Sequence, residues 1–273
     1  MVRFSILTWN IQGRHYYGYT PFSKIAPLLE ETRADIICLQ EFPQAHAALQ
    51  ATRFDERYKV IIPPHNERDG GVVNHNVSFS RFPIKQHGEL DLTKPAQMPW
   101  WEKNVWFDVV LPGAILRVYN CHFGLKRLGI SHRLAFLDEV FRHAARHKGP
   151  VIVCGDMNTV IPPRGFLRSG IRWFNSIPKS TFYVDDQYFP GDERHIFRQR
   201  AKAAGYTDPT PIDANTWRLP KKPFGILRLK LDWILVRGLK TEPAQFGKIV
   251  SDHRWVQATC ILDSESHSAS PAK

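Results

Sequence analysis

The stretch Val151-Ile-Val-Cys-Gly-Asp156-Met-Asn158-Thr159 carries an apolar run directly into a pair of polar side chains. A short apolar, β-branched run that ends at glycine is typical of a buried strand. Asp156 and Asn158 are two residues apart, so a chain that stays extended points both to the same side. A carboxylate and an amide at a sheet edge can orient a water and hold a phosphoryl oxygen or a hard cation. A strand followed by an ordinary Asx-type turn explains the stretch equally well.

The composition predicts a folded, basic chain. Hydrophobic residues make up 43% of the 273 residues, which is enough for a large core and too much for a disordered chain. Lys and Arg total 37 against 26 Asp and Glu, so the net charge is +11. A basic surface favours partners that carry phosphate, such as nucleic acid, anionic lipid or polyanionic metabolites. A generally basic protein without such a target is the alternative that charge alone leaves open.

The cysteines and the start of the chain bear on its compartment. Cys38, Cys121, Cys154 and Cys260 each lie in an apolar segment, and no two of them have CxxC spacing. This pattern predicts buried thiols in a reducing compartment rather than disulfides or a zinc cluster. The chain begins with a strand-like segment instead of a signal-peptide core, and no apolar run is long enough to span a bilayer. We therefore expect a cytoplasmic, monomeric protein with no integral membrane segment.

Periodicity predicts strands and helices along most of the chain. Strands are expected at residues 4–11, 34–41, 58–62, 74–80, 105–111, 115–122, 151–156, 229–236 and 255–262. Helices are expected at 22–32, 44–53, 131–147 and 193–204, the last within an otherwise irregular segment, 160–225. Short strands mixed with a few helices favour a two-sheet core flanked by helices. With no repeat or composition shift, we expect one domain over residues 1–262 and a flexible tail over 263–273.

Polar side chains recur where the predicted strands end. Each has an ordinary explanation by itself, because a terminal Asn often forms a turn and a lone His is often a hydrogen-bonded core residue. Their order along the chain resembles the endonuclease/exonuclease/phosphatase superfamily, which includes deoxyribonuclease I, exonuclease III, neutral sphingomyelinases, inositol polyphosphate 5-phosphatases and tyrosyl-DNA phosphodiesterases. The resemblance covers residues 4–262, and its motifs are Asn10 in TWN, Glu41 in LQE, His122 in NCHF, Asp156 and Asn158 in GDMN, Asp232 in LDWILV, and Asp252 and His253 in SDH.

The resemblance implies an α/β fold, a four-layer α/β-sandwich in which two mixed β-sheets pack face to face with flanking helices. It places the active site at one edge of the sandwich. Glu41 is a hard oxygen ligand, which suits Mg²⁺ or Mn²⁺ better than zinc. The resemblance further implies that Glu41 is the central metal ligand, that Asn10 supports it, and that Asp252 helps to bind a metal.

The same resemblance assigns the chemistry around the phosphate. It implies that Asp156 orients or deprotonates the attacking water and that Asn158 hydrogen-bonds the scissile phosphate. His253 would act beside the phosphate as a base or as a cation, with Asp232 fixing its tautomer. A carboxylate beside the imidazole predicts a raised pKa for His253. Asp232 as part of an ordinary surface ion pair is the alternative.

His122 distinguishes branches of the superfamily. Deoxyribonuclease I and the sphingomyelinases have His at this point, where it can serve as a general acid, whereas abasic-site endonucleases have Tyr. The deoxyribonuclease I histidine has a carboxylate partner on the strand that corresponds to residues 74–80, but this chain has Asn74 and Asn76 there. We expect Asn76 to hydrogen-bond His122 or the phosphate. Gln12 stands where several nucleases have Asp, which weakens the case for a second metal.

The second half of the chain offers candidate substrate contacts. Arg218, in the sequence Thr-Trp-Arg, can contact a phosphate or be an ordinary surface residue. The Trp100-Trp101 pair can stack on bases, and Trp233 is expected in the core. A basic cluster in or near the long segment predicts either a phosphate-binding rim or a solvated helix face. Its members are Arg194, Arg198, Arg200, Lys202, Lys221, Lys222, Arg228 and Lys230.

These features together predict a metal-dependent phosphoesterase that hydrolyses phosphodiester bonds in nucleic acid, either DNA or RNA. A phospholipid or small-molecule phosphoesterase of the same fold is the first alternative, although no apolar hairpin suited to membrane insertion is present. A non-catalytic nucleic-acid-binding module is the second alternative. Such a module has no need of the complete set Glu41, Asp156, Asn158, Asp232, Asp252 and His253.

Overall fold

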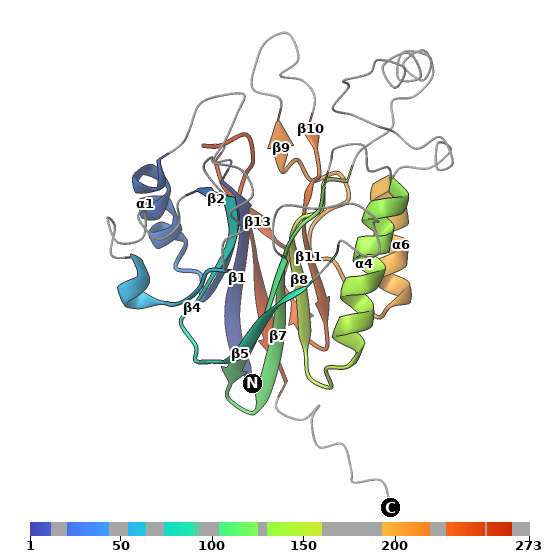
Figure 1. Cartoon of the computed structure of the whole chain (residues 1–273), viewed down its shortest axis with the longest axis horizontal. Coiled ribbons are helices and arrows are strands. Elements are labelled where there is room, and N and C mark those ends of the chain that lie inside the picture. The colour runs from blue at the N-terminus through green and yellow to red at the C-terminus, as the bar shows by residue number, and fades with distance from the viewer. Residues whose placement is uncertain are drawn as a thin grey trace, which may run out of the picture.

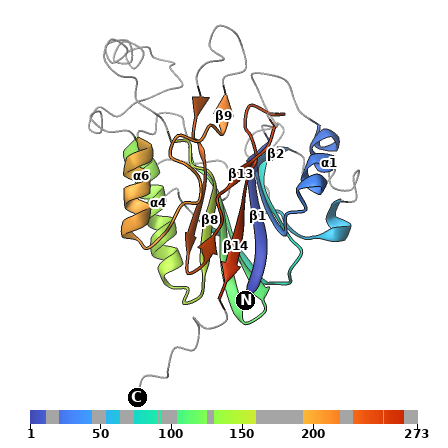
Figure 2. The same cartoon turned by 180° about the vertical axis from the view of Figure 1, so that it is seen from behind.

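Two β-sheets pack face to face in the computed structural model, and helices cover their outer sides (Figure 1, Figure 2). The structure describes residues 1–11, 21–43, 54–63, 74–90, 92, 104–124, 130–159, 193–218, 228–248 and 250–263. This arrangement of helix, sheet, sheet and helix confirms the predicted four-layer α/β-sandwich.

The first sheet has the strand order β12-β14-β1-β2-β4-β3, with β13 paired to β14. It is mixed, because β1 runs antiparallel to β14 and parallel to β2. Its strands are β1 (Val2–Asn10), β2 (Ile36–Pro43), β3 (Lys59–Ile61), β4 (Asn74–Ser80), β12 (Lys240–Thr241), β13 (Gln245–Phe246) and β14 (Val256–Leu262).

The second sheet has the order β11-β8-β7-β6-β5, and only β7 and β8 are parallel within it. Its strands are β5 (Ile84–Leu90), β6 (Asn104–Leu111), β7 (Ala114–His122), β8 (Val151–Asp156) and β11 (Asp232–Arg237). A short separate pair joins β9 (Trp217–Arg218) to β10 (Arg228–Leu229). The sequence did not predict β5, since this edge strand exposes three successive polar side chains, Lys85, Gln86 and His87, and lacks apolar alternation.

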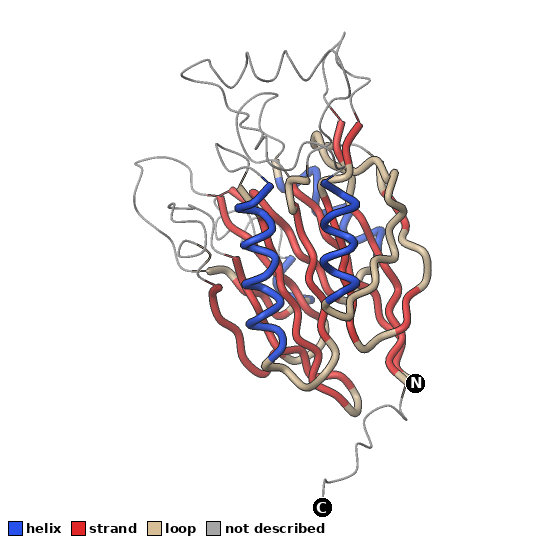
Figure 3. Tube along the Cα trace, turned by 90° about the vertical axis from the view of Figure 1, so that its right-hand side faces the viewer, coloured by secondary structure: helices blue, strands red, loops and turns tan. Residues whose placement is uncertain are grey.

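Helices cover both outer faces. α1 (Phe22–Thr32) buries Phe22, Ile25 and Leu29 against the first sheet. α4 (Ile130–Ala145) and α6 (Glu193–Ala203) lie side by side over the second sheet (Figure 3). These three helices confirm the predictions for their segments. A 3₁₀ turn, η1 (Phe54–Arg57), precedes β3, and the helix predicted at 44–53 lies outside the described residues.

The layer between the sheets changes from apolar to polar along the strands. Away from the polar end, this layer is a hydrophobic core cluster to which both sheets contribute. The inward-facing residues in chain order are Phe4, Ile6, Thr8 and Asn10 on β1, Leu116, Val118, Asn120 and His122 on β7, and Ile152, Cys154 and Asp156 on β8. The alternation of side chains along a strand thus delivers polar groups to one rim of the sandwich. That rim carries the candidate site.

Other predictions concern the cysteines, the end of the chain and membranes. Cys38, Cys121, Cys154 and Cys260 are buried free thiols, as predicted. β14 ends at Leu262, and the predicted tail beyond Asp263 lies outside the described residues. Among the helices that the structure describes, none is long and apolar enough to cross a membrane.

Candidate active site

Side chains from both sheets meet at the polar rim. Asn10, the last residue of β1, donates from Nδ2 to Glu41 Oε1 at 3.1 Å and to Asp156 Oδ2 at 2.9 Å. His122 Nε2 lies 3.9 Å from Glu41 Oε1 and 3.7 Å from Asp156 Oδ2. These residues end β1, β7 and β8 or lie near the end of β2, so the predicted convergence of strand ends is confirmed.

A β-bulge places Glu41. Leu39 pairs with Val77 and Phe42 pairs with His75, so Gln40 and Glu41 share the space opposite one residue of β4. Glu41 has a φ of 53°, in the left-handed region. This conformation costs a non-glycine residue about 1–2 kcal/mol, so the surrounding contacts must hold it.

Asp156 is held by a turn on one side and by a close strand contact on the other. Asn158 N donates to Asp156 Oδ1 at 2.9 Å, which forms an Asx-type turn, and Asn158 has a φ of 50°. Asn158 Nδ2 donates to Phe123 O at 2.5 Å. The chain is therefore no longer extended at Asn158, and of the two interpretations that the sequence left open, the strand followed by an Asx-type turn is the one formed. The Asx-type turn is therefore part of the candidate site, because Asp156 belongs to both.

Gly155 brings β7 and β8 together directly behind Asp156. Its φ is 134°, and a Cβ atom there would lie 1.8 Å from Cys121 O, so the position requires glycine. The resulting register pairs His122 with Asp156. A backbone requirement thus brings these two polar side chains to the same level of the rim.

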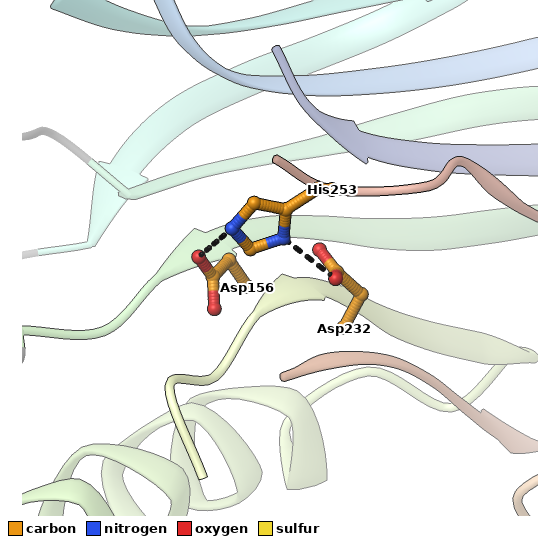
Figure 4. A group of neighbouring side chains, drawn as sticks. All are labelled: Asp156, Asp232 and His253. Atoms are coloured by element: carbon orange, nitrogen blue, oxygen red, sulfur yellow. Dashed lines mark hydrogen bonds and ion pairs between the residues drawn. The ribbon is translucent and has the colours of Figure 1, made fainter. Parts of the chain in front are cut away.

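His253 lies between two carboxylates (Figure 4). Its Nδ1 is 2.9 Å from Asp232 Oδ2, and its Nε2 is 3.7 Å from Asp156 Oδ2. Burial alone lowers the pKa of His253, but Asp232, Asp252 and Asp156 outweigh it and raise that pKa to about 10. Burial raises the pKa of Asp232, and His253 opposes this rise. The predicted pairing and the raised His253 pKa are confirmed, and a surface ion pair is excluded because Asp232 is fully buried.

The Ser-Asp-His segment is anchored to β1. Ser251 Oγ donates to Asn10 O at 2.9 Å and accepts from His253 N at 3.0 Å. Trp9 Nε1 lies 3.2 Å from both Ser251 Oγ and His253 O. The sequence showed Ser251 only as part of a motif. The signal that it offered was the two-residue spacing to His253, which allows a serine side chain to cap a main-chain N–H.

Asp252 is oriented by a tryptophan. Trp217 Nε1 donates to Asp252 Oδ2 at 2.9 Å, and Asp252 Oδ1 lies 3.9 Å from His253 Nε2. Thr216, the preceding residue, accepts main-chain N–H bonds from Leu231 and Asp232 at 2.9 and 3.0 Å. The segment Thr216-Trp217 thus contacts Asp232 and Asp252, two of the acidic neighbours of His253, a role that the sequence did not reveal.

Several buried polar atoms at the rim have no hydrogen-bond partner within the described part of the chain. They are both amide atoms of Asn76, Oδ1 of Asp232 and Oδ1 of Asp252. The expected bond from Asn76 to His122 is therefore not formed. Buried polar atoms are normally paired, so these four atoms at the rim are available to bind a polar ligand. The side chains of Asn74 and Arg218, together with Gln12, Trp100, Trp101, Lys221 and Lys222, lie outside the described residues.

The basic cluster was expected to form either a phosphate-binding rim or a solvated helix face, and Lys230 forms neither. Lys230 is fully buried, and its Nζ donates to Asp208 Oδ2 at 2.6 Å, to Thr210 O at 3.3 Å and to Thr210 Oγ1. Arg198 also pairs with Asp208, and Arg200 pairs with Asp138. Arg198 and Lys230 thus share Asp208, and the Arg200–Asp138 pair links α6 to α4. Trp233 is buried in the core, as predicted.

The donor chemistry at the rim fits a hard divalent cation. The Glu41 and Asp156 carboxylates both converge on Asn10 Nδ2, and oxygen atoms are the ligands that Mg²⁺ and Mn²⁺ prefer. Asp156, Asp232 and His253 also have ligand atoms within 4.8 Å of one another. There, however, the hydrogen bond between His253 and Asp232 already engages His253 Nδ1 and Asp232 Oδ2. The Glu41 side is therefore the better match.

A sequence profile of the Endonuclease/Exonuclease/phosphatase family matches residues 7–253. The chain belongs to this family. A search of curated proteins gave no match. The family resemblance stated from the motifs is thus confirmed over nearly the whole chain.

Solved structures of this fold agree with that assignment. TDP2 from Caenorhabditis elegans has a TM-score of 0.64 and 17% identity over 95% of this chain and 75% of its own. A family protein from Leptotrichia buccalis has a TM-score of 0.65 and 16% identity over 95% of this chain and 100% of its own. ANGEL2, described as a 2′,3′-cyclic phosphatase, has a TM-score of 0.62 and 15% identity over 94% of this chain and 95% of its own. Identities this low show a shared fold and leave the substrate to be argued from the site.

Proposed function

We propose that this member of the Endonuclease/Exonuclease/phosphatase family hydrolyses phosphodiester bonds in nucleic acid with the help of Mg²⁺ or Mn²⁺. The observation that carries the proposal is the contact of His253 with Asp232 and Asp156, beside the Asn10–Glu41 pair. The net charge of +11 supports a polyanionic substrate. A nucleic-acid-binding module needs no buried carboxylate–imidazole pair.

Glu41 is the proposed central ligand of the cation. Asn10 fixes the Glu41 carboxylate through its 3.1 Å hydrogen bond, and Asp252, whose Oδ1 lies 3.9 Å from His253 Nε2, would add a further oxygen. A divalent cation at such a site neutralises charge that develops on phosphoryl oxygens. The Glu41 and Asp156 carboxylates share one amide, Asn10 Nδ2, and a divalent cation would offset their mutual repulsion, which supports this assignment.

Asp156 and His253 would act at the reacting phosphorus. Asp156 accepts from Asn10 and Asn158, so its position is fixed from two sides and it can orient an attacking water. Asp232 Oδ2 accepts a hydrogen bond from Nδ1 of His253, and this orientation of the ring directs Nε2 towards the rim. With three carboxylates around it, His253 is suited to donate from Nε2 to a phosphoryl oxygen as charge builds there.

The remaining residues would bind the substrate and protonate the leaving oxygen. His122 Nε2 faces the rim between Glu41 and Asp156, where a general acid can reach the leaving group. Asn76 offers an unpartnered amide to a phosphoryl oxygen. Asn158 and Arg218 are proposed as further phosphate contacts.

The decisive experiment supplies Mg²⁺ or Mn²⁺ and separate substrates: plasmid, single-stranded DNA, RNA, phospholipid vesicles and a chromogenic phosphodiester. We expect cleavage of DNA or RNA that is lost with EDTA and in Asp156→Asn. The matched control is Asp138→Asn, because Asp138 is an exposed carboxylate paired with Arg200 away from the rim, and this variant should retain activity.

Other outcomes contradict the proposal. Activity confined to phospholipid would place the protein among lipid phosphoesterases. Activity confined to the small phosphodiester would indicate a small-molecule enzyme. Binding of nucleic acid without any hydrolysis would indicate a binding module.

A further inference from the structure

Two buried amides connect the sheets one level below the candidate site. Gln40 Nε2 donates to Asn120 Oδ1 at 2.7 Å, which joins β2 of the first sheet to β7 of the second. Gln40 Nε2 also lies 3.1 Å from both Thr8 Oγ1 and Cys38 O. Gln40 and Asn120 are both fully buried, so this contact between the sheets is shielded from water.

The pair sits directly behind residues of the rim. Asn120 precedes His122 by two positions on β7, so both side chains point between the sheets. Gln40 immediately precedes Glu41 in the bulge. A shift of the Gln40–Asn120 contact would therefore displace Glu41 and His122. His122 Nε2 and Glu41 Oε1 lie 3.9 Å apart.

Asn120 also braces the bulge itself. Its Nδ2 lies 3.2 Å from Leu39 O and 3.1 Å from Val77 O, and these two residues form the last regular pair before the irregularity. It lies 3.1 Å from Ser78 Oγ as well. The same amide thus holds both strands at the point where the chain turns into the left-handed conformation of Glu41.

We infer that Asn120, together with Gln40, is a positioning residue that maintains the β2 bulge and thereby fixes Glu41 relative to His122. This inference rests on the proposed function for the reaction that the positioning serves. Neither residue touches the reacting atoms. Their effect passes through Glu41, whose conformation is unfavourable without outside support.

The test compares Asn120→Leu and Gln40→Met, which keep side-chain size but remove the amides, with the control Tyr58→Phe. Tyr58 OH is a buried donor to Ala34 O at 3.1 Å, far from the rim, so the control also removes one buried hydrogen bond. Amide hydrogen exchange of residues 39–42 reports on the bulge without requiring activity. Chemical denaturation gives stability, and kcat and KM are measured with a chromogenic phosphodiester under conditions where every variant is folded.

We expect Asn120→Leu to accelerate exchange at residues 39–42 at least about tenfold and to lower kcat at least about tenfold, with KM changed less than about threefold. Gln40→Met should act in the same direction, and Tyr58→Phe should match the wild type in exchange at 39–42 and in kcat.

Unchanged exchange at residues 39–42 would overturn the inference, and so would faster exchange with an unchanged kcat. A loss of kcat that Tyr58→Phe shares at equal stability would also overturn it, since the role would then be structural. If the wild-type protein hydrolyses no substrate, the proposed function fails, and the exchange rates still decide whether the amide pair maintains the bulge.

Discussion

A buried cation, Lys230, and a buried anion, Asp232, lie two residues apart where the chain enters β11, and they are satisfied in different ways. Lys230 Nζ uses its three donors on Asp208 and Thr210 and lies 3.8 Å from the centre of the Trp233 ring, on the side covered by α4 and α6. Asp232 faces the space between the sheets, where Oδ2 pairs with His253 and Oδ1 has no hydrogen-bond partner in the described part of the chain.

The difference separates structural charges from functional ones. A buried charge whose hydrogen-bonding capacity is complete has no reason to accept a ligand. A buried charge with an unused atom at a rim retains that capacity for a substrate or an ion. Changes at Asp232 should therefore alter the reaction, whereas changes at Lys230 should alter stability.

The largest expected effect is that of Asp232→Asn. The variant removes the acceptor that directs the His253 ring, so we expect kcat to fall roughly 10³- to 10⁴-fold. Removing Asp232 also withdraws support from the protonated His253 ring, so kcat is compared per folded molecule and stability is measured separately. Single-turnover kinetics and urea denaturation measure the two quantities. Activity within tenfold of the wild type would group Asp232 with the structural charges.

Lys230→Met should show the opposite pattern. It removes charged hydrogen bonds to Asp208 and Thr210, so we expect the free energy of unfolding to fall by roughly 2–3 kcal/mol. The value of kcat per folded molecule should stay within about twofold. Denaturant unfolding and kcat at saturating substrate test this, and a lost activity at unchanged stability would contradict the comparison.

The protonation of Lys230 gives a pH-dependent form of the same comparison. Burial lowers its pKa to about 8, against the opposing effect of Asp208. The unfolded chain keeps the ordinary value of 10.5, so between about pH 8 and 10 the unfolded state binds more protons and stability rises with pH. The stability of the wild type minus that of Lys230→Met should increase by up to about 1.4 kcal/mol per pH unit in this window. A flat or falling difference in denaturation experiments would refute the assignment.

The smallest expected effect is that of Trp217→Phe. This change keeps an aromatic ring but removes the N–H that fixes Asp252 Oδ2. We expect a loss of about 1 kcal/mol in transition-state stabilisation, or roughly fivefold in kcat. Trp106→Phe, on β6 away from the rim, is the control. An equal loss in both variants would show that Trp217 acts only through packing.

Much of the site could be predicted because its residues stand where apolar strands end. Asp156 follows an unbroken apolar run, and His253 follows the Ser-Asp pair, so motif order was sufficient to place them in one site. The bulge at Glu41 could not be predicted, because it depends on the register against β4, which is set by the partner strand rather than by local sequence.

The charge cluster near Lys230 shows a second limit of the sequence. Lysine and arginine are exposed in most proteins, so a basic cluster indicates a surface. The partner that buries Lys230, Asp208, is separated from it by 22 positions and has no motif of its own. Edge strand β5 was missed for a related reason, since its polar residues match its exposure but resemble a loop.

The bulge in β2 has a consequence for how this site can be altered. Side chains on a regular strand alternate, so if this sequence paired with β4 without the bulge, Glu41 would face α1 with Leu39, and Phe42 would enter the rim. With it, Phe42 packs against Phe22 of α1 at a ring-centroid distance of 4.5 Å. If the same residues paired regularly with β4, an acid would be exchanged for a phenyl ring at the rim. The site therefore depends on the pairing register of β2 as much as on the identity of any residue.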